Sequence, residues 1–195
     1  MKKHLDLGCG DKIFDIKNAL GIDHKNDQIE SFGIDIQNFN FKNFIKCDLF
    51  LESIPFENDF FDYVTALDFM EHVPRYIFKE KIVLPYIELM NEVYRVLKVG
   101  GKFFIKGPPF NQRFFNDPTH VNPITIDSIV TYFASGIHPD LKPFFNCTKT
   151  PPHPWSKPYG FKGNFEVFLF EINDYSLENH DKKIPEQFLI GLEKI

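Results

Sequence analysis

Cysteine is scarce in this sequence, with three residues among 195. Cys9, Cys47 and Cys147 lie far apart, and none belongs to a Cys-x-x-Cys pair. A disulfide framework or a cysteine-based zinc site needs more cysteines at closer spacings. The sequence therefore predicts a protein without disulfides or structural zinc, as is typical of the reducing cytoplasm.

Long apolar runs and an excess of basic residues are also missing. No stretch approaches the roughly 18 apolar residues of a membrane-spanning helix, and Met1 leads into a predicted strand without a signal peptide. The net charge is −5, from 22 basic and 27 acidic residues, so we expect no nucleic-acid partner. Hydrophobic residues make up 43% of the chain. Without a linker or repeat, we expect residues 1–195 to form one domain around a single core.

A glycine turn near the start of the chain lacks the third glycine of a dinucleotide-binding motif. Residues 3–7 form an apolar, strand-like run, and Gly8-Cys9-Gly10 follows it. Such a turn cradles nucleotides in open α/β sheets, but Ile13 stands where the third glycine belongs. This favours S-adenosylmethionine (SAM), which has a nucleoside and no phosphate, and disfavours a nicotinamide dehydrogenase. The candidate cofactor-binding residues of this turn are Asp6, Gly8, Cys9 and Gly10.

Acidic residues follow the next predicted strands. Two Gly-Ile-Asp segments end in Asp23 and Asp35, and an acid at the tip of the second strand can accept hydrogen bonds from both ribose hydroxyls. Asp35 is favoured because apolar residues flank it on both sides, and Asp23 is the alternative. Asp48 and Leu49 follow the third predicted strand, where they could contact the amine and ring of adenine. The plainer interpretation of Asp48 is a turn.

The strongest strand and helix patterns lie between residues 60 and 106. Residues 60–66 are strongly apolar, which is typical of a strand inside a parallel sheet. Apolar residues at three- and four-residue steps predict a helix over 86–97, ended by Gly100-Gly101 and followed by a strand over 102–106. Ligands of such sheets bind at the carboxyl ends of the strands. The candidates after the fourth strand are therefore Ala66, Leu67 and Asp68.

Residues 107–160 are predicted to form a substrate-binding or lid insertion. Residues 138–158 contain six prolines, which excludes a long helix or a central strand, and long irregular connections are usually functional. Thr125 is a candidate cap for a helix that ends near Ala134. Residues 165–172 predict an antiparallel strand at the end of the sheet, and the amphipathic C-terminal tail predicts a short helix.

Taken together, these segments resemble class I SAM-dependent methyltransferases. The resemblance rests on LDLGCG, CDL, FFDYVTALDFMEHVPR and YRVLKVGG in this order, with Val99 where the family usually has proline. The further segments NDPTHVNPIT and YGFKGNFEV resemble a branch of short bacterial enzymes, so that the resemblance covers about residues 3–172.

The resemblance implies an α/β fold with a three-layer, Rossmann-like, seven-stranded sheet in the order 3-2-1-4-5-7-6, in which the last strand is antiparallel. It implies SAM as the cofactor, with S-adenosylhomocysteine as its product. Because no helix precedes the first strand, residues 107–160 or a second subunit of a homodimer would cover the substrate. The implied contacts are Gly8 and Gly10 with the amino-acid half of SAM, Asp35 with its ribose, Asp48 and Leu49 with adenine, and Ala66, Leu67 and Asp68 with the methionine moiety.

Two histidines are candidates for a catalytic base. A hydroxyl acceptor needs a group that takes its proton, and histidine can do so near neutral pH. His120 is the first candidate, with Asp117 to orient its ring, and His72 is the second; each could instead simply hold a loop through hydrogen bonds. We assign no metal ligands from the sequence, although Asp117, His120 and an acid such as Asp68 or Glu71 could bind a divalent cation.

The acceptor is less well defined by the sequence. Phe110, Phe114, Phe115 and residues 155–159 could line an acceptor pocket or simply pack the lid. By analogy with the family, we expect methylation of a small polar acceptor on oxygen, such as a sugar or a related building block of surface polysaccharide. A catalytically silent SAM- or nucleotide-binding domain with a protein partner is the alternative. An RNA methyltransferase is disfavoured by the acidic balance and by the absence of an NPPY-type tetrapeptide.

Overall fold

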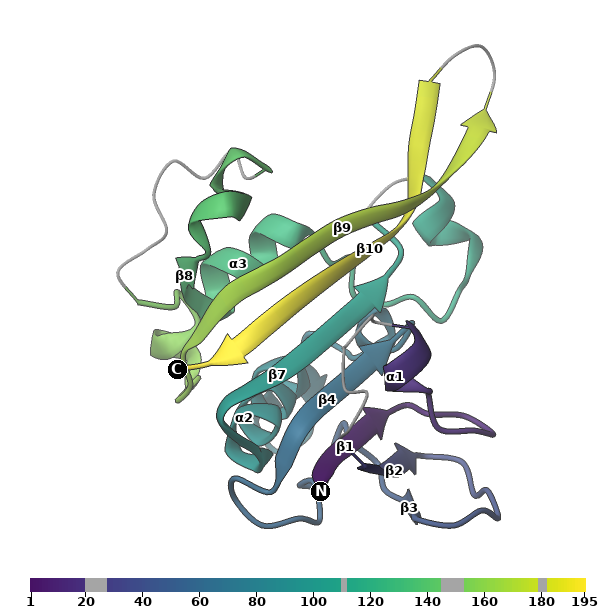
Figure 1. Cartoon of the computed structure of the whole chain (residues 1–195), viewed down its shortest axis with the longest axis vertical. Helices are drawn as coiled ribbons and strands as arrows, with labels where there is room; N and C mark the ends of the chain where they lie inside the picture. Colours follow the sequence, from purple (N-terminus) through teal and green to yellow (C-terminus); the bar gives the residue numbers. More distant parts are fainter. Residues whose placement is uncertain (20–27, 110–111, 145–152, 179–181) are drawn as a thin grey trace.

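The computed structural model describes residues 1–19, 28–109, 112–144, 153–178 and 182–195. Its centre is an eight-stranded sheet in the order β3-β2-β1-β4-β7-β10-β9-β8 (Figure 1). β10 is antiparallel to both of its neighbours, and the other neighbouring pairs are parallel. The strands are β1 (Lys2–Leu7), β2 (Ile29–Asp35), β3 (Phe44–Lys46), β4 (Phe61–Leu67), β7 (Leu97–Gly107), β8 (Ala134–Ile137), β9 (Phe165–Glu178) and β10 (Lys182–Lys194).

Helices cover both faces of this sheet. The larger buried cluster combines α2 (Pro85–Val96) and α3 (Ile126–Phe133) with sheet residues such as Phe103. The smaller cluster joins Ile16 of α1 (Ile16–Ala19) to sheet residues that include Phe104. Successive strand residues point to opposite faces, so α1 lies across the sheet from α2 and α3. The other elements are the 3-10 helices η1 (Met70–His72), η2 (Gln112–Asn116), η3 (Pro139–Phe144) and η4 (Lys157–Tyr159), and a hairpin of β5 (Ile77–Phe78) and β6 (Ile82–Val83).

This architecture confirms the predicted fold class. The predicted order 3-2-1-4-5-7-6 corresponds to β3-β2-β1-β4-β7-β10-β9. The structure adds β8 as an eighth strand beyond β9, which the sequence did not indicate because its four residues, Ala-Ser-Gly-Ile, carry little strand pattern. The parallel strands end at one edge of the sheet, where ligands of this fold bind.

The prediction of a helical C-terminal tail was wrong, because residues 182–194 form β10 inside the sheet. Leu189 and Ile190 belong to the clusters on opposite faces of the sheet, so the strand is buried on both sides. A short, continuous apolar run cannot be distinguished from a buried helix by its periodicity alone. Residues 165–172 do form a strand, but β9 runs in the same direction as β7, and β8 rather than β9 is the edge.

The predicted helix over 86–97 is confirmed as α2, but Gly100 and Gly101 do not end it. The helix stops at Val96, and Leu97 already pairs with Phe61 of β4. The register then shifts before the next pair, and Gly100 adopts a φ of 74° in this irregular stretch of β7. The two glycines therefore permit a bulge within the strand.

The predicted cap of α3 is confirmed. The side chain of Thr125 accepts a hydrogen bond from Ser128 N at 3.1 Å, and Ser128 Oγ accepts one from Thr125 N at 3.2 Å. This reciprocal pair satisfies two main-chain donors at the start of the helix. It fixes where α3 begins.

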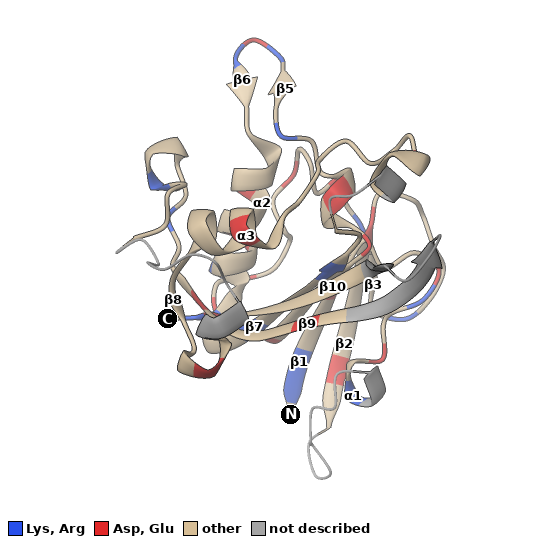
Figure 2. Ribbon diagram, turned by 90° about the horizontal axis from the view of Figure 1, so that it is seen from above, with Lys and Arg blue, Asp and Glu red and all other residues tan. Residues whose placement is uncertain are grey.

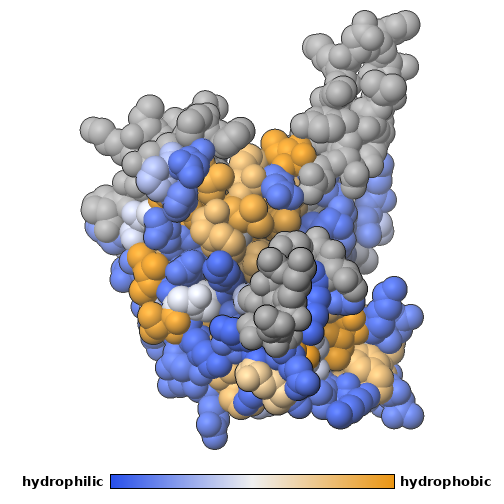
Figure 3. Space-filling view, in the orientation of Figure 1, coloured by the Kyte–Doolittle hydropathy of each residue, from blue (hydrophilic) through white to orange (hydrophobic). Residues whose placement is uncertain are grey.

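The surface mixes charges of both signs. In the part of the chain that the structure describes, lysines and arginines form no continuous basic face in the view of Figure 2. Hydrophobic side chains are exposed over β9 and β10 on the face that Figure 3 shows. Within the described ranges, every helix is too short or too polar to cross a membrane.

Candidate functional site

The glycine turn after β1 lies at the carboxyl edge of the sheet and is tied to β2. Gly8 N and Cys9 N donate to the carbonyl oxygen of Ile34 at 2.8 and 3.1 Å. Gly10 N donates to Asp35 Oδ2 at 3.1 Å. Gly8 and Gly10 have φ angles of 66° and 60°, left-handed values that glycine adopts without steric cost. The predicted turn is therefore present and held against the end of β2.

The two glycines of this turn have different surroundings. A Cβ on Gly8 would lie 2.3 Å from Cδ2 of Phe69, the residue two positions after β4. A Cβ on Gly10 would meet nothing within 4 Å in the described part of the chain. Gly8 is thus required for packing, whereas the backbone at Gly10 faces open space that a ligand can occupy.

Asp35, the favoured ribose ligand, ends β2 and is half-buried. Besides the bond from Gly10 N to Oδ2, its Oδ1 accepts one from Gln37 N at 2.8 Å. A carboxylate offers about four lone-pair positions, so Asp35 retains acceptor capacity for two more donors, as a ribose diol requires. Asp23, the alternative ligand, lies outside the described residues.

Asp48 and Leu49 follow β3 at the same edge. Asp48 Oδ1 accepts from Phe50 N at 3.0 Å, and its carbonyl oxygen accepts from Leu51 N and Glu52 N at 2.9 and 2.8 Å. Asp48 therefore forms a turn, which was its plainer interpretation. Leu49 is buried in the core, so only its main chain is placed to contact a ligand.

An aromatic pair that the sequence did not single out joins two of these loops. Phe50, after β3, stacks on Phe69, after β4, with their ring centroids 6.1 Å apart. Phe69 also covers Gly8. The chain has 24 phenylalanines, so composition cannot indicate which rings face the site. Their position directly after two strand ends was the available signal.

The residues that end β4 reach the same edge. Ala66 is fully buried, and Asp68 begins the following loop with a φ of 51°. Asp68 Oδ1 accepts from Gln187 Nε2 at 3.0 Å, and Oδ2 lies 3.8 Å from Lys106 Nζ. These partners belong to β10 and β7, so Asp68 links the end of β4 to both strands. Leu67, the last residue of β4, is half-buried and pairs with Lys106 of β7.

Asp6 and Cys9 support the turn and do not offer reactive groups. The Asp6 carboxylate is 4% exposed and accepts from Phe14 N at 2.8 Å and from Thr65 Oγ1 at 2.6 Å. Burial raises the pKa of Asp6 to about 6, although both donors act to lower it. Burial, with the charges of Asp6 and Asp35, raises the pKa of the Cys9 thiol to about 12. Such a thiol stays protonated and is not nucleophilic.

His4 extends the buried network beneath the turn. Thr65 Oγ1 gives its one proton to Asp6, so it accepts from His4 Nε2 at 2.8 Å. His4 Nδ1 lies 3.2 Å from Ser31 Oγ, which donates to it. Burial lowers the pKa of His4 to about 4, so the ring is neutral near physiological pH. The four side chains thus fix β1 to β2 and β4.

The predicted histidines meet beside η1, together with Glu71. One ligand-type atom from each of Glu71, His72 and His120 lies within 4.8 Å of the other two. The two imidazole rings lie edge to face, with centroids 4.9 Å apart. Glu71 is 2% exposed, and burial raises its pKa to about 7. The structure therefore assembles one cluster from segments that are far apart in the sequence.

Asp117 lies at the border of this cluster. Its Oδ1 accepts from Thr119 N and Thr119 Oγ1 at 2.8 and 2.6 Å, and its Oδ2 lies 3.7 Å from His120 Nε2. The Thr119 donors lower the pKa of Asp117. Asp117 is thus an ionised turn cap that acts on His120 through its charge and not through a hydrogen bond.

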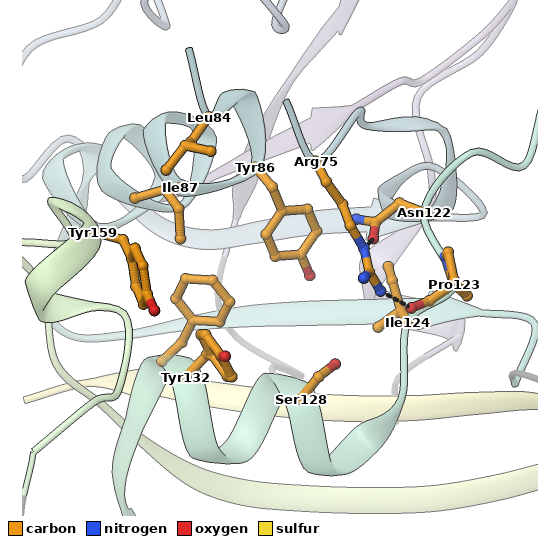
Figure 4. A pocket seen from close by; sticks show the side chains of 11 residues that line it. Arg75, Leu84, Tyr86, Ile87, Asn122, Pro123, Ile124, Ser128, Tyr132 and Tyr159 are labelled. Atoms are coloured by element: carbon orange, nitrogen blue, oxygen red, sulfur yellow. Dashed lines mark hydrogen bonds between the residues drawn. The ribbon is translucent and has the colours of Figure 1, made fainter. Parts of the chain in front are cut away.

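A cavity of about 310 Å³ lies between α2 and α3 (Figure 4). Arg75 and Asn122 close one end, where Arg75 Nε donates to Asn122 Oδ1 at 2.7 Å. Asn122 N donates to the carbonyl oxygen of Glu71 at 2.9 Å, so the cavity adjoins the histidine cluster. The other lining residues are Leu84, Tyr86, Ile87, Pro123, Ile124, Ser128, Tyr132, Phe133 and Tyr159.

The aromatic residues expected around an acceptor lie in different surroundings: some face the cavity, some are exposed to solvent and some are buried. Tyr159 lines the cavity, and Trp155 is 56% exposed. Phe114 is buried, with its ring 5.0 Å from the ring of His120. Phe110 lies outside the described residues. Packing thus accounts for Phe114, whereas Tyr159 faces the cavity.

The family model described as a methyltransferase domain matches residues 5–105, just over half of the chain, and the chain belongs to this family. The resemblance seen in the sequence is thereby confirmed, and the family implies SAM as the cofactor. No curated protein is similar enough in sequence to count as a match.

Solved structures support the same fold. A SAM-dependent methyltransferase from Archaeoglobus fulgidus is 20% identical, with a TM-score of 0.57 over 99% of this chain and 86% of that one. A second, from Methanosarcina mazei, is 21% identical, with a TM-score of 0.51 over 99% of this chain and 92% of that one. The likeness extends over the whole fold, β10 included.

Proposed function

We propose that the protein transfers the methyl group of SAM to a hydroxyl oxygen of a small polar acceptor. One observation carries the proposal: Glu71 and His72 closely follow Phe69, whose side chain covers the glycine turn, and their ligand-type atoms lie within 4.8 Å of that of His120. Groups that can take a proton therefore adjoin the edge where ligands of such sheets bind. SAM, when bound, supplies a methyl group that its sulfonium has already activated.

The residues at this edge fit SAM. The open backbone at Gly10 leaves space for the ligand, and Asp35 retains acceptors for two hydroxyls. Asp48 and the main chain of Leu49 would flank adenine. Asp6 would support the turn from beneath, through Phe14 N and Thr65. The proposed neighbours of the methionine moiety are Gly8, Cys9, Gly10, Ala66, Leu67 and Asp68.

His120 is the proposed base. Its Nδ1 donates to the carbonyl oxygen of Phe114 at 2.9 Å, so Nε2 carries the lone pair. A neutral alcohol is a poor nucleophile, and transfer of its proton to Nε2 would make the oxygen more reactive toward the methyl carbon. The bond from that carbon to sulfur would break as the new C–O bond forms, which leaves S-adenosylhomocysteine. Asp117, 3.7 Å from Nε2, would stabilise the resulting imidazolium. His72 is the alternative base.

The cavity between α2 and α3 is the proposed acceptor site. Aromatic side chains such as Tyr86, Tyr132 and Tyr159 suit the apolar faces of a sugar ring, and Arg75 and Ser128 add polar groups. Several lining residues come from segment 107–160, which supports a lid role for this segment within one domain of residues 1–195. A sugar or related building block of surface polysaccharide is the acceptor class that we propose, by family analogy.

Calorimetric titration with S-adenosylhomocysteine, with NAD as the control ligand, tests the cofactor site. We expect binding of the first ligand only, followed by methylation of sugar or nucleotide-sugar acceptors from labelled SAM. Binding without turnover, unchanged in His120→Ala, would instead indicate a silent binding domain. Binding of NAD would contradict the proposal.

Two variants separate the proposed roles. Asp35→Ala removes two charged hydrogen bonds to ribose and should weaken S-adenosylhomocysteine binding by about 100-fold, whereas Asp23→Ala should not. The reverse result would move the ribose site to Asp23. His120→Ala should abolish turnover at nearly unchanged S-adenosylhomocysteine affinity, and normal turnover would exclude it as the base.

A further inference from the structure

We propose that Glu71, His72 and His120 bind a divalent transition-metal ion such as Zn²⁺. Their ligand-type atoms already lie within 4.8 Å of one another. In a site with bonds of about 2.1 Å, ligand atoms are roughly 3 to 3.5 Å apart. Side-chain movements of about 1 Å would therefore close the three groups around one ion.

Glu71 supplies the strongest argument for an ion. Its side chain is 2% exposed, and Oε2 has no hydrogen-bond partner among the described residues. This oxygen lies against the backbone of Gly107, where a Cβ would be 3.2 Å away. A buried carboxylate oxygen without a donor is costly unless a cation or a proton satisfies it. The two neighbouring histidines offer lone pairs and no charge of their own when neutral, so a cation would satisfy all three groups.

The hydrogen bonds of both imidazoles prepare them as ligands. His72 Nδ1 lies 3.1 Å from the carbonyl oxygen of Thr119, and His120 Nδ1 lies 2.9 Å from that of Phe114. A carbonyl oxygen only accepts, so Nδ1 carries the proton in each ring and Nε2 keeps its lone pair. Metal-binding histidines are commonly oriented by this kind of bond from the other ring nitrogen.

The main chain keeps the ligands together without the ion. Val121 N and Asn122 N both donate to the carbonyl oxygen of Glu71, at 3.0 and 2.9 Å. These bonds tie the segment that carries His120 to η1, which carries the other two ligands. The site is thus organised before an ion binds, which lowers the cost of binding.

The ligand types restrict the ion. Two imidazoles and one carboxylate suit Zn²⁺ or Fe²⁺, whereas Mg²⁺ and Ca²⁺ prefer oxygen ligands. Three protein ligands leave at least one coordination position for water or for an acceptor oxygen.

Only the role of the ion in methyl transfer rests on the proposed function. An acceptor hydroxyl bound to the open position would have a lower pKa and would release its proton to solvent. His120 would then be a ligand and not the base. Metal binding itself does not depend on which acceptor is methylated.

Titration of chelator-treated, full-length protein with Co²⁺ and with Zn²⁺ tests the site without any need for turnover. We expect one equivalent to bind, with visible Co²⁺ absorption bands that report nitrogen and oxygen ligands. Glu71→Gln and His120→Gln should each weaken binding by at least about 100-fold. His138→Gln is the matched control, because the side chain of His138 is 52% exposed and its Nδ1 lies 3.5 Å from Oδ2 of Asp140, away from the proposed ligands in the sequence. This control variant should bind Co²⁺ and Zn²⁺ with the affinity of the unchanged protein.

S-adenosylhomocysteine binding by each variant reports an intact fold. If Glu71→Gln no longer binds S-adenosylhomocysteine, its fold is not intact, and the metal affinity of His120→Gln alone tests the proposal. Absence of stoichiometric binding to the unchanged protein would overturn the proposal, as would equal affinities in both ligand variants and the control. Metal binding with failed methyl transfer would contradict only the proposed function.

Discussion

Replacing Thr65 by valine probes the buried network beneath the glycine turn. Valine keeps the shape of the side chain and removes the hydroxyl. Neither Thr65 nor His4 is exposed, so the change leaves His4 Nε2–H without its acceptor and takes from Asp6 one of its two donors. Each buried group deprived of a partner costs about 1–3 kcal/mol. We therefore expect the free energy of unfolding to fall by about 2–4 kcal/mol.

Urea unfolding near neutral pH measures this loss as a lower midpoint at an unchanged slope. Thr65→Ser is the matched control, because it keeps the hydroxyl and loses one methyl group, at a cost of about 1 kcal/mol. If the valine variant proved as stable as the serine variant, the hydroxyl would contribute nothing and the reasoning would be refuted.

Two further predictions concern the same region. Burial holds the folded-state pKa of His4 at about 4, below its ordinary 6.5. Between these two pH values the unfolded chain binds a proton at His4 that the folded protein does not, so the contribution of His4 to folding stability is complete above pH 6.5 and is lost as the pH falls toward 4. Asp6 has the opposite effect, because its raised pKa of about 6 makes the folded state less stable as the pH rises from 3.8 to 6. The free energy of unfolding of the unchanged protein should therefore rise by about 3 kcal/mol more than that of His4→Gln between pH 4 and 7. Urea unfolding at both pH values tests this, and an equal difference in stability between the two proteins at both pH values would contradict it. Gly8→Ala should lower the melting temperature more than Gly10→Ala, because only the first places a Cβ, at 2.3 Å, against Phe69; the second has the left-handed strain alone, about 1–2 kcal/mol, and equal melting temperatures would argue against the packing role.

The sequence predicted the first strand, the glycine turn and the position of Asp35 because these signals are local. A strand, a glycine turn and an acid at the next strand end lie within 35 residues, and each follows from backbone rules. The structure accordingly places Gly10 N against Asp35. Asp6, in contrast, has the same residue type but a buried position, and only its contacts with Phe14 and Thr65 assign it a supporting role.

The two histidines of the cluster could be predicted only as separate candidates. His72 and His120 are 48 positions apart, and no periodicity connects them. Their contact depends on the main-chain bonds from Val121 and Asn122 to Glu71, which leave no pattern in the side chains. The need for a proton acceptor near the methyl donor suggested both histidines, but chemistry alone could not show that they would face each other.

The error over the C-terminal tail bears on the site as well as on the fold. β10 lies between β7 and β9, so the sheet is continuous only after the last residues of the chain have paired. The same strand carries Gln187, whose amide donates to Asp68 at the end of β4. Asp68 is therefore positioned partly by a residue 119 positions away, which no local pattern around residues 66–68 can encode. The loop after β4 thus depends on the pairing of β10, and the apolar sequence of that strand leaves its conformation ambiguous.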